Sequence, residues 1–406
     1  MNSISIKYSI YAVLIATIIA RFWGMFFMLP QGIKLVFSVL LWFSILSFPW
    51  IYAKRNEFGK VNIFILFLLA LGVLQTVRSL IVDSDINIGN KYITIIFNEY
   101  GALLFFPPLF CYLANNNKSF KYIVRGCFYL ILFFCLYFII GKNCFYILPI
   151  FIAPLYTLAN KKEKNLIILA IGGALIQAFD GVRMAFVFVL ISLVTLLILT
   201  FFYNKTLIKY LSIGLLVSPL LLFLPLLFSA GGEDSIFMTM QEYLQMKHVQ
   251  DDILVDSRTF LYLEMAEDLN HTNSWLLGKG AYGHYYSYFF EMSKSGEGDY
   301  HYRLASEVPF LNLLLHGGII YVLLYYSLFI IAIYRALWYG KSRFMQTIAI
   351  TLSTYAFMTF VGDLNGCCWF HLVIFFYIGC CFSDHWLNMT DTELKTLSTI
   401  KNTFLL

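Results

Sequence analysis

The sequence predicts an all-α integral membrane protein with about twelve transmembrane helices and one long, helical exported loop. Of its 406 residues, 60% are hydrophobic and only 13% are charged, and the mean hydropathy is +0.76. Such a chain has too few polar residues to cover a soluble globule. Apolar runs recur along it, basic residues fall between alternate pairs of runs, and one polar insert interrupts them late. This pattern is typical of a polytopic membrane protein.

The predicted spans are apolar runs long enough to cross about 30 Å of hydrocarbon. They are 8–29, 33–53, 61–80, 93–114, 119–140, 144–159, 165–179, 184–203, 208–229, 307–334, 345–361 and 368–383. The chain then divides into nine helices (1–229), a loop with amphipathic helices (230–306), three helices (307–383) and a tail (384–406). We expect the tail to be a short cytoplasmic appendage.

Basic residues predict which connections face the cytoplasm. Lysines and arginines fall at both ends of the chain and in every second connection, as at Lys60, Arg125 and Lys341. By the positive-inside rule these segments are cytoplasmic, so the insert lies on the outer face. The net charge of +5 is dispersed, and no basic stripe indicates a nucleic-acid partner. The insert contains no cysteine, and no histidine and cysteine grouping has zinc spacing, so we expect neither a disulfide scaffold nor a metal site.

Ionisable residues in or near the spans are candidate functional residues, because a charge in hydrocarbon is costly unless it is paired or hydrated. They are Arg21, Arg78, Glu99, Asp180, Arg183, Glu307 and Asp363. Arg183 is either an interfacial arginine paired with Asp180 or a guanidinium that grips phosphate through its planar fork. For Arg78, on the span next to that of Glu99, a structural ion pair is the simpler interpretation.

The insert is expected to form helices over 236–246 and 260–269, where apolar residues recur at helical spacing. Asp256 or Ser257 is the expected N-cap of the second helix. Arg258 then stands in a first turn whose dipole favours an anion. It is either a solvated arginine paired with nearby acids or an anion ligand.

A glycine segment, Leu-Leu-Gly-Lys-Gly-Ala-Tyr-Gly-His, follows in the insert. It matches G-x-G-x-x-G, but no βαβ unit surrounds it, so we do not expect nucleotide binding. Gly278 and Gly280 would let the backbone approach a phosphate or a sugar, with Lys279, Tyr282 and His284 as further substrate contacts. Tyrosines here are also typical of an aromatic belt at the membrane interface. Acids outnumber bases in the insert, so it does not attract anions as a whole.

Glu307 opens the span that follows the insert. A carboxylate at a helix N-terminus is ordinarily a cap. If it is partly buried at the membrane boundary, it has a raised pKa and suits the role of general base. The sequence leaves both interpretations open.

Together these features resemble O-antigen polymerases of the Wzy type. The resemblance rests on the Arg183 motif, Arg258 at the head of an exported helix, the glycine segment, and Glu307-Val-Pro-Phe-Leu with Gly317. The layout is similar over nearly the whole chain, and the motifs cover about residues 180–318. These proteins share a superfamily of polytopic glycosyltransferases with the O-antigen ligases, in which a histidine followed by asparagine stands where this chain has glutamate. The outer loops here contain fewer arginines than the arginine-rich loops of polymerases.

The resemblance implies a GT-C-like enzyme in a bacterial inner membrane, with cytoplasmic termini and a periplasmic active site. It would join undecaprenyl-pyrophosphate-linked oligosaccharide repeats without a cofactor. Its partners would be that substrate and membrane lipid, and a polysaccharide chain-length regulator is a further candidate partner.

The same resemblance implies roles for individual residues. Arg183 and Arg258 would clamp the pyrophosphate, Glu307 would be the base, Asp180 would orient Arg183, and Arg78 would contact the second lipid carrier. The alternatives are an O-antigen ligase and a flippase or transporter for lipid-linked oligosaccharides. Transporters usually have two related halves, and this sequence shows no such symmetry.

Overall fold

A computed structural model describes residues 11, 58–81, 100–138, 148–179, 183–201, 203–228, 259–288, 301–362 and 369–398. The fold is discussed for these residues. The first two predicted spans lie almost entirely outside them, and the predicted helix 236–246 lies wholly outside.

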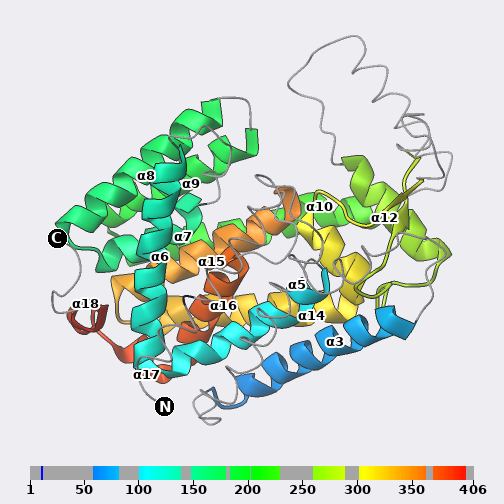
Figure 1. Cartoon of the computed structure of the whole chain (residues 1–406), viewed down its shortest axis with the longest axis horizontal. Coiled ribbons are helices and arrows are strands. Elements are labelled where there is room, and N and C mark those ends of the chain that lie inside the picture. Colours follow the sequence, from blue (N-terminus) through cyan, green and yellow to red (C-terminus); the bar gives the residue numbers. More distant parts are fainter. Residues whose placement is uncertain are drawn as a thin grey trace.

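The described chain is mostly helical, and Figure 1 shows the arrangement of its elements. The helices are α3 (Val61–Ile81), α5 (Tyr100–Leu109), η2 (Phe110–Asn115), α6 (Asn117–Phe138), α7 (Leu148–Leu158), α8 (Lys161–Phe179), α9 (Arg183–Phe201), α10 (Lys205–Phe228), α12 (Thr259–His271), α14 (Pro309–Trp338), α15 (Arg343–Val361), α16 (Trp369–Phe382), α17 (Asp384–Asn388) and α18 (Asp391–Ser398). Two short strands, β1 (Tyr285–Tyr286) and β2 (Tyr302–Arg303), pair antiparallel.

Four of the described helices, α3, α10, α14 and α15, are long and apolar enough to cross a membrane. Leu103–Asn115, Val189–Ile198 and His371–Phe382 are shorter apolar helical segments. This agrees with a helical membrane protein, although within the described ranges four helices meet both conditions, against the twelve spans predicted for the whole chain.

Helix α15 forms the centre of the bundle, and α10 and α3 lie at its periphery. Almost all of α15 is buried, with Phe329 of α14 stacked on Tyr355 of α15 at a ring-centroid distance of 5.6 Å. In contrast, α10 leaves Leu221 71% exposed and α3 leaves Ile63 66% exposed. Exposed apolar faces of this kind suit contact with lipid.

The described part of the tail, residues 384–398, packs against the bundle, whereas the sequence predicted a short appendage there. Trp386 is buried, stacks on Phe120 at 4.3 Å, and donates from its indole N–H to the carbonyl of Ala114 at 2.5 Å. The backbone N–H of Lys341 donates to the carbonyl of Leu387 at 3.0 Å. Burial of Trp386 and Leu387 stabilises this packing because both side chains leave solvent.

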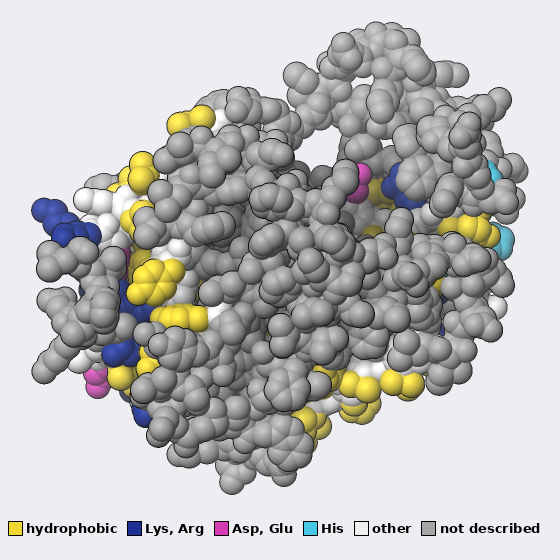
Figure 2. All heavy atoms as spheres, in the orientation of Figure 1, with side chains coloured by type: hydrophobic (Ala, Val, Ile, Leu, Met, Phe, Trp, Pro, Cys, Tyr) yellow, Lys and Arg dark blue, Asp and Glu magenta, His cyan; other side chains and the backbone are white. Residues whose placement is uncertain are grey.

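The two ends of the bundle differ in composition. The described part of the insert, with α12, lies at one end, and α17 and α18 lie at the other (Figure 1). Lysine and arginine side chains gather at the α18 end (Figure 2). Lys205 and Lys341 line a cavity at this end together with Asp384. Lys161 and Lys162 directly precede Glu163, which pairs with Arg125, and Arg125 donates to the carbonyl of Ser398 at the end of α18. All of these basic residues belong to connections predicted to be cytoplasmic.

Candidate functional site

The glycine segment is built into the end of the bundle between α3 and α14. Gly278 and Gly280 have φ of 64° and 86°, in the left-handed region that favours glycine. The N–H of Lys279 donates to the carbonyl of Leu315 at 2.6 Å, and the N–H of Ala281 donates to the carbonyl of Gln75 at 3.3 Å. The loop is therefore held by backbone bonds to two helices that are distant in sequence.

Helix α14 is kinked at Gly318, and the kink is where the loop enters. Gly318 has φ 73° and ψ 179° inside the helix. The carbonyl of Leu315 accepts from the loop, while the N–H of Ile319 donates out of the helix to the carbonyl of Trp275 at 2.8 Å. Loop and helix thus exchange hydrogen bonds, which satisfies backbone groups that the kink leaves unpaired.

Side chains of α3 and α14 complete the attachment. Arg78 donates from Nη1 to the carbonyl of Gly278 at 2.8 Å, and Gln75 donates from Nε2 to the carbonyl of Leu277 at 2.5 Å. The N–H of Tyr282 donates to Oγ of Ser79 at 3.0 Å. Nδ1 of His316, on α14, lies 2.9 Å from the carbonyl oxygen of Gly280. Arg78 is thus bonded to the loop, and its expected partner Glu99 lies outside the described residues.

Lys279 is held inside the protein. Its ammonium forms an ion pair with Asp268 of α12 and donates to the carbonyl of His284 at 3.0 Å. The two side chains of the pair are 15% and 10% exposed. Asp268 also accepts from the N–H of Tyr286 at 3.2 Å. Lys279 therefore joins the glycine loop to α12 and is a positioning residue in this structure.

The aromatic residues that follow the glycines are largely buried. Tyr282 is 4% exposed and Tyr285 is fully buried, so neither presents its ring on the surface. Burial raises the pKa of Tyr285, and the nearby Arg303 opposes that rise. His284 is half-buried and meets the ring of Tyr302 edge-on at 5.0 Å. Tyr285–Tyr286 and Tyr302–Arg303 pair antiparallel here, and sequence periodicity did not predict this strand pair.

Removing the Lys279 charge should destabilise the protein. We expect Lys279→Met to cost up to about 3–5 kcal/mol, because it leaves the mostly buried Asp268 carboxylate without its cation. The double variant Lys279→Met/Asp268→Asn should recover most of this loss, since the asparagine is neutral and can still accept from Tyr286. Thermal midpoints of the purified variants in detergent check this. Equal midpoints for the single and double variants would contradict the ion pair.

Glu307 lies in a turn, Ser306–Val308, whose backbone is held by hydrogen bonds and which we call the pinned turn. Oδ1 of Asn312 accepts from the N–H of Ser306 at 2.7 Å, and its Nδ2 donates to the Ser306 carbonyl at 2.8 Å. The N–H of Val308 donates to Oγ of Ser306 at 3.1 Å. Ser306, Val308 and Asn312 are at most 1% exposed, whereas Glu307 is exposed.

The structure changes both interpretations of Glu307. Helix α14 starts at Pro309, and Val308 is its N-cap. Glu307 therefore lies one residue before the N-cap position and does not cap the helix. Nor is it partly buried as a base was expected to be. The turn instead fixes the backbone on both sides of a carboxylate that solvent reaches.

The structure brings six predicted site residues together: Arg78, Gly278, Lys279, Gly280, Tyr282 and His284. Arg183 begins α9, and its side chain lies outside the described part of the chain, as do Asp180 and Arg258. The sequence did not single out Gln75, Ser79, Asn312 and His316 as attachment residues. Polar residues four apart on an otherwise apolar span, as Gln75 and Ser79 are, were the available signal.

Within the described ranges, no group of three or more histidine, cysteine, aspartate or glutamate residues is arranged to hold a metal ion. The chain matches no known protein family, no curated protein and no solved structure.

Proposed function

We propose that the protein is a polymerase of the Wzy type that joins undecaprenyl-pyrophosphate-linked oligosaccharide repeats into a surface polysaccharide such as O-antigen. The observation that carries this proposal is the pinned turn at Ser306–Val308. It holds an exposed carboxylate at the start of α14, and the glycine loop docks on the same half of that helix. A solvent-accessible carboxylate on a hydrogen-bonded turn suits a base that must meet a substrate hydroxyl.

The charge distribution supports a periplasmic site. Basic side chains gather at the α18 end (Figure 2), and the described part of the insert, with α12, lies at the other end (Figure 1). With the basic end in the cytoplasm, the glycine loop and Glu307 face the periplasm. Twelve spans in a bacterial inner membrane, with both termini cytoplasmic, complete this proposal.

The proposed reaction needs one base and a clamp on the leaving group. Glu307 takes the proton of the acceptor's terminal hydroxyl, and that oxygen forms a bond to the anomeric carbon of the donor. The bond from this carbon to the pyrophosphate oxygen breaks, and undecaprenyl pyrophosphate leaves with its electron pair. Arg183, oriented by Asp180, and Arg258 neutralise the charge that develops on the pyrophosphate.

Arg78 is assigned to the second lipid carrier in this proposal. Its hydrogen bond to Gly278 uses one of the five N–H donors of the guanidinium, and the side chain is half-buried at the loop end of α3. Because the guanidinium is planar and rigid, one hydrogen bond also fixes the direction in which its other N–H groups point.

Purified protein supplied with one defined lipid-linked repeat tests the function, because a polymerase gives a ladder of products. Deletion of the gene separates the alternatives. Loss of a polymerase leaves single repeats on the lipopolysaccharide core, and loss of a ligase leaves polymer on the lipid carrier. Loss of a flippase traps repeats on the cytoplasmic side.

Arg183→Lys should lower the rate of chain growth roughly tenfold or more, because lysine keeps the charge but loses the planar fork. Product ladders made by purified protein measure the effect. Arg343→Lys is the matched control, since Arg343 lies at the α18 end, with its guanidinium 4.4 Å from the ring centroid of Tyr203. Near-normal growth with Arg183→Lys would assign Arg183 to the membrane interface instead.

A further inference from the structure

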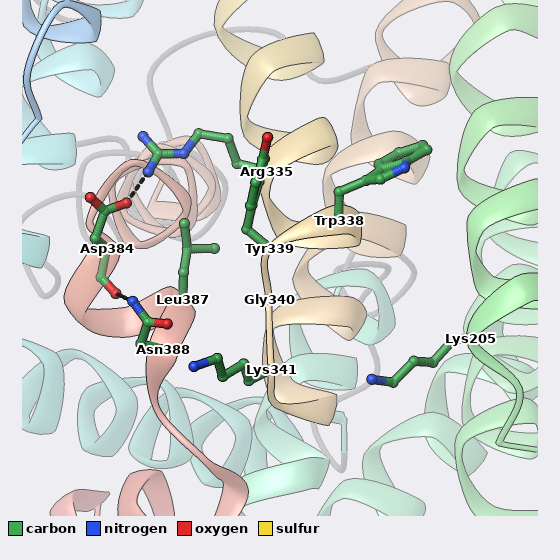
Figure 3. A pocket seen from close by; sticks show the side chains of 9 residues that line it. All are labelled: Lys205, Arg335, Trp338, Tyr339, Gly340, Lys341, Asp384, Leu387 and Asn388. Atoms are coloured by element: carbon green, nitrogen blue, oxygen red, sulfur yellow. Dashed lines mark hydrogen bonds and ion pairs between the residues drawn. The ribbon is translucent and has the colours of Figure 1, made fainter.

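A cavity of about 750 Å³ opens at the α18 end, far from the glycine loop. It lies between the start of α10, the end of α14 and α17 (Figure 3). Its lining residues are Lys205, Arg335, Trp338, Tyr339, Gly340, Lys341, Asp384, Leu387 and Asn388. Neither the proposed reaction nor the glycine loop uses any of them.

The cavity has an excess of positive charge. Arg335 pairs with Asp384, the single acid of the lining, and also donates to the carbonyl of Phe382 at 3.0 Å. Lys205 and Lys341 are exposed and form no ion pair with any described residue. The Glu393 carboxylate of α18 lies near enough to Lys341 to interact with it. Neither ammonium group is held in an ion pair with a residue that the structure describes, so both remain available to an anion, and the N-terminus of α10 adds its positive partial charge.

Aromatic residues place the cavity at the depth of a membrane interface. Trp338, Tyr339, Tyr334 and Tyr210 are 47%, 58%, 47% and 72% exposed. Nζ of Lys209 lies 4.7 Å from the ring centroid of Trp338. Exposed tryptophan and tyrosine beside lysine are typical of the headgroup region, where an apolar ring and a polar edge are both satisfied.

The length of α14 agrees with this depth. The stretch from Gly318 to Arg335 is about 25 Å long at a rise of about 1.5 Å per residue. This is close to the roughly 30 Å thickness of a hydrocarbon core. On this spacing the glycine loop and the cavity would lie near opposite faces of a membrane. Exposed leucines follow α10 from Leu207, near the cavity, to Leu221 and Leu222, about four helical turns further on.

We propose that this cavity binds the phosphate of an anionic phospholipid headgroup through Lys205 and Lys341. The lipid's acyl chains would lie along the exposed apolar face of α10, and Trp338 and Tyr339 would border its glycerol region. Basic cavities between transmembrane helices on the cytoplasmic side hold such headgroups. The site is separate from the proposed polymerase chemistry and stands without it.

The test uses the full-length protein, delipidated in detergent and titrated with cardiolipin, phosphatidylglycerol or phosphatidylcholine. Native mass spectrometry counts bound lipid, and the thermal midpoint reports stabilisation. We expect cardiolipin and phosphatidylglycerol to bind and stabilise, and phosphatidylcholine to do neither. Lys205→Gln/Lys341→Gln should weaken anionic lipid binding roughly tenfold or more. The variant should still fold, because both side chains are exposed and form no ion pair with the described residues.

Lys161→Gln/Lys162→Gln is the matched control, because it removes two exposed lysines at the same end but outside the cavity. Equal weakening in this control would overturn the proposal, since general charge would then explain the binding. A separate titration with inorganic phosphate distinguishes the source of the anion. Lysine-dependent stabilisation by phosphate, with none by anionic lipid, would overturn the lipid assignment in favour of a soluble ligand.

Discussion

Gly318→Ala is expected to leave little stable protein. A Cβ at this position would overlap the carbonyl of Leu276 and lie 2.5 Å from the nitrogen of Gly278. The φ of 73° and ψ of 179° fall in a region that only glycine occupies readily, which costs other residues about 1–3 kcal/mol before any overlap. Because the colliding atoms are backbone, the loop must move away from α14. We expect a total loss of at least about 3 kcal/mol, a large part of the stability of a typical domain.

Gly172→Ala is the matched control for that variant. Gly172 lies in α8 and is exposed, and a Cβ added there would meet no neighbouring atom within 4 Å. Alanine there should be neutral or stabilising by up to about 1 kcal/mol, because it favours the helix. Thermal midpoints and the monodisperse fraction in size-exclusion chromatography compare the two variants. Similar midpoints for both would show that the kink at Gly318 does not require glycine.

The ends of the later helices were predictable because hydropathy and turn residues agree there. The span predicted over 345–361 is α15, Arg343–Val361, and the one over 368–383 is α16, Trp369–Phe382. Pro309 explains why α14 starts two residues after the predicted 307, since proline suits the first turn of a helix. Local sequence therefore determined these elements.

The break near Pro107 was not predicted, although its cause is visible in the sequence. The described part of the expected span 93–114, from residue 100 on, forms α5, with Pro107 and Pro108 inside its last turn, and then η2. Proline removes backbone donors, which favours the tighter 3-10 geometry that follows. A prediction from hydropathy alone treats α5 and η2 as one span, because both segments are apolar.

The sequence singled out the glycine segment, but it did not show which parts of the protein would lie against it. Gly278 and Gly280 were predicted to allow a close backbone approach, and both have positive φ. In the structure, the backbone of α14 and side chains of α3 lie against these two glycines and their neighbours. The bond from Arg78 to Gly278 joins residues 200 positions apart, and no local pattern contains that information. The sequence likewise showed no sign that Lys279 pairs with Asp268, because that partner is identified only by the folded arrangement.

Glu307→Gln is expected to abolish polymer ladders while leaving the fold intact. Glutamine has nearly the same shape, and the side chain it replaces is exposed, so the bonds between Ser306 and Asn312 remain. An amide cannot accept the proton of the acceptor hydroxyl, and loss of a general base typically lowers a rate about 10²–10⁴-fold. Purified protein with a defined lipid-linked repeat should then return unextended substrate, with an unchanged thermal midpoint.

Glu393→Gln makes the same chemical change at the opposite end of the bundle. Glu393 is exposed in α18, where hydrogen bonds from Thr390 lower the pKa of its carboxyl group, and a glutamine there can still accept from Thr390. This variant should give normal ladders. Normal ladders from Glu307→Gln as well would remove Glu307 from the chemistry, and the pinned turn would then serve only to start α14. If polymer ladders are lost in Glu307→Gln alone, and its thermal midpoint equals that of the unmodified protein, the missing carboxylate explains the loss. Both variants make the same change in side-chain shape, and both fold.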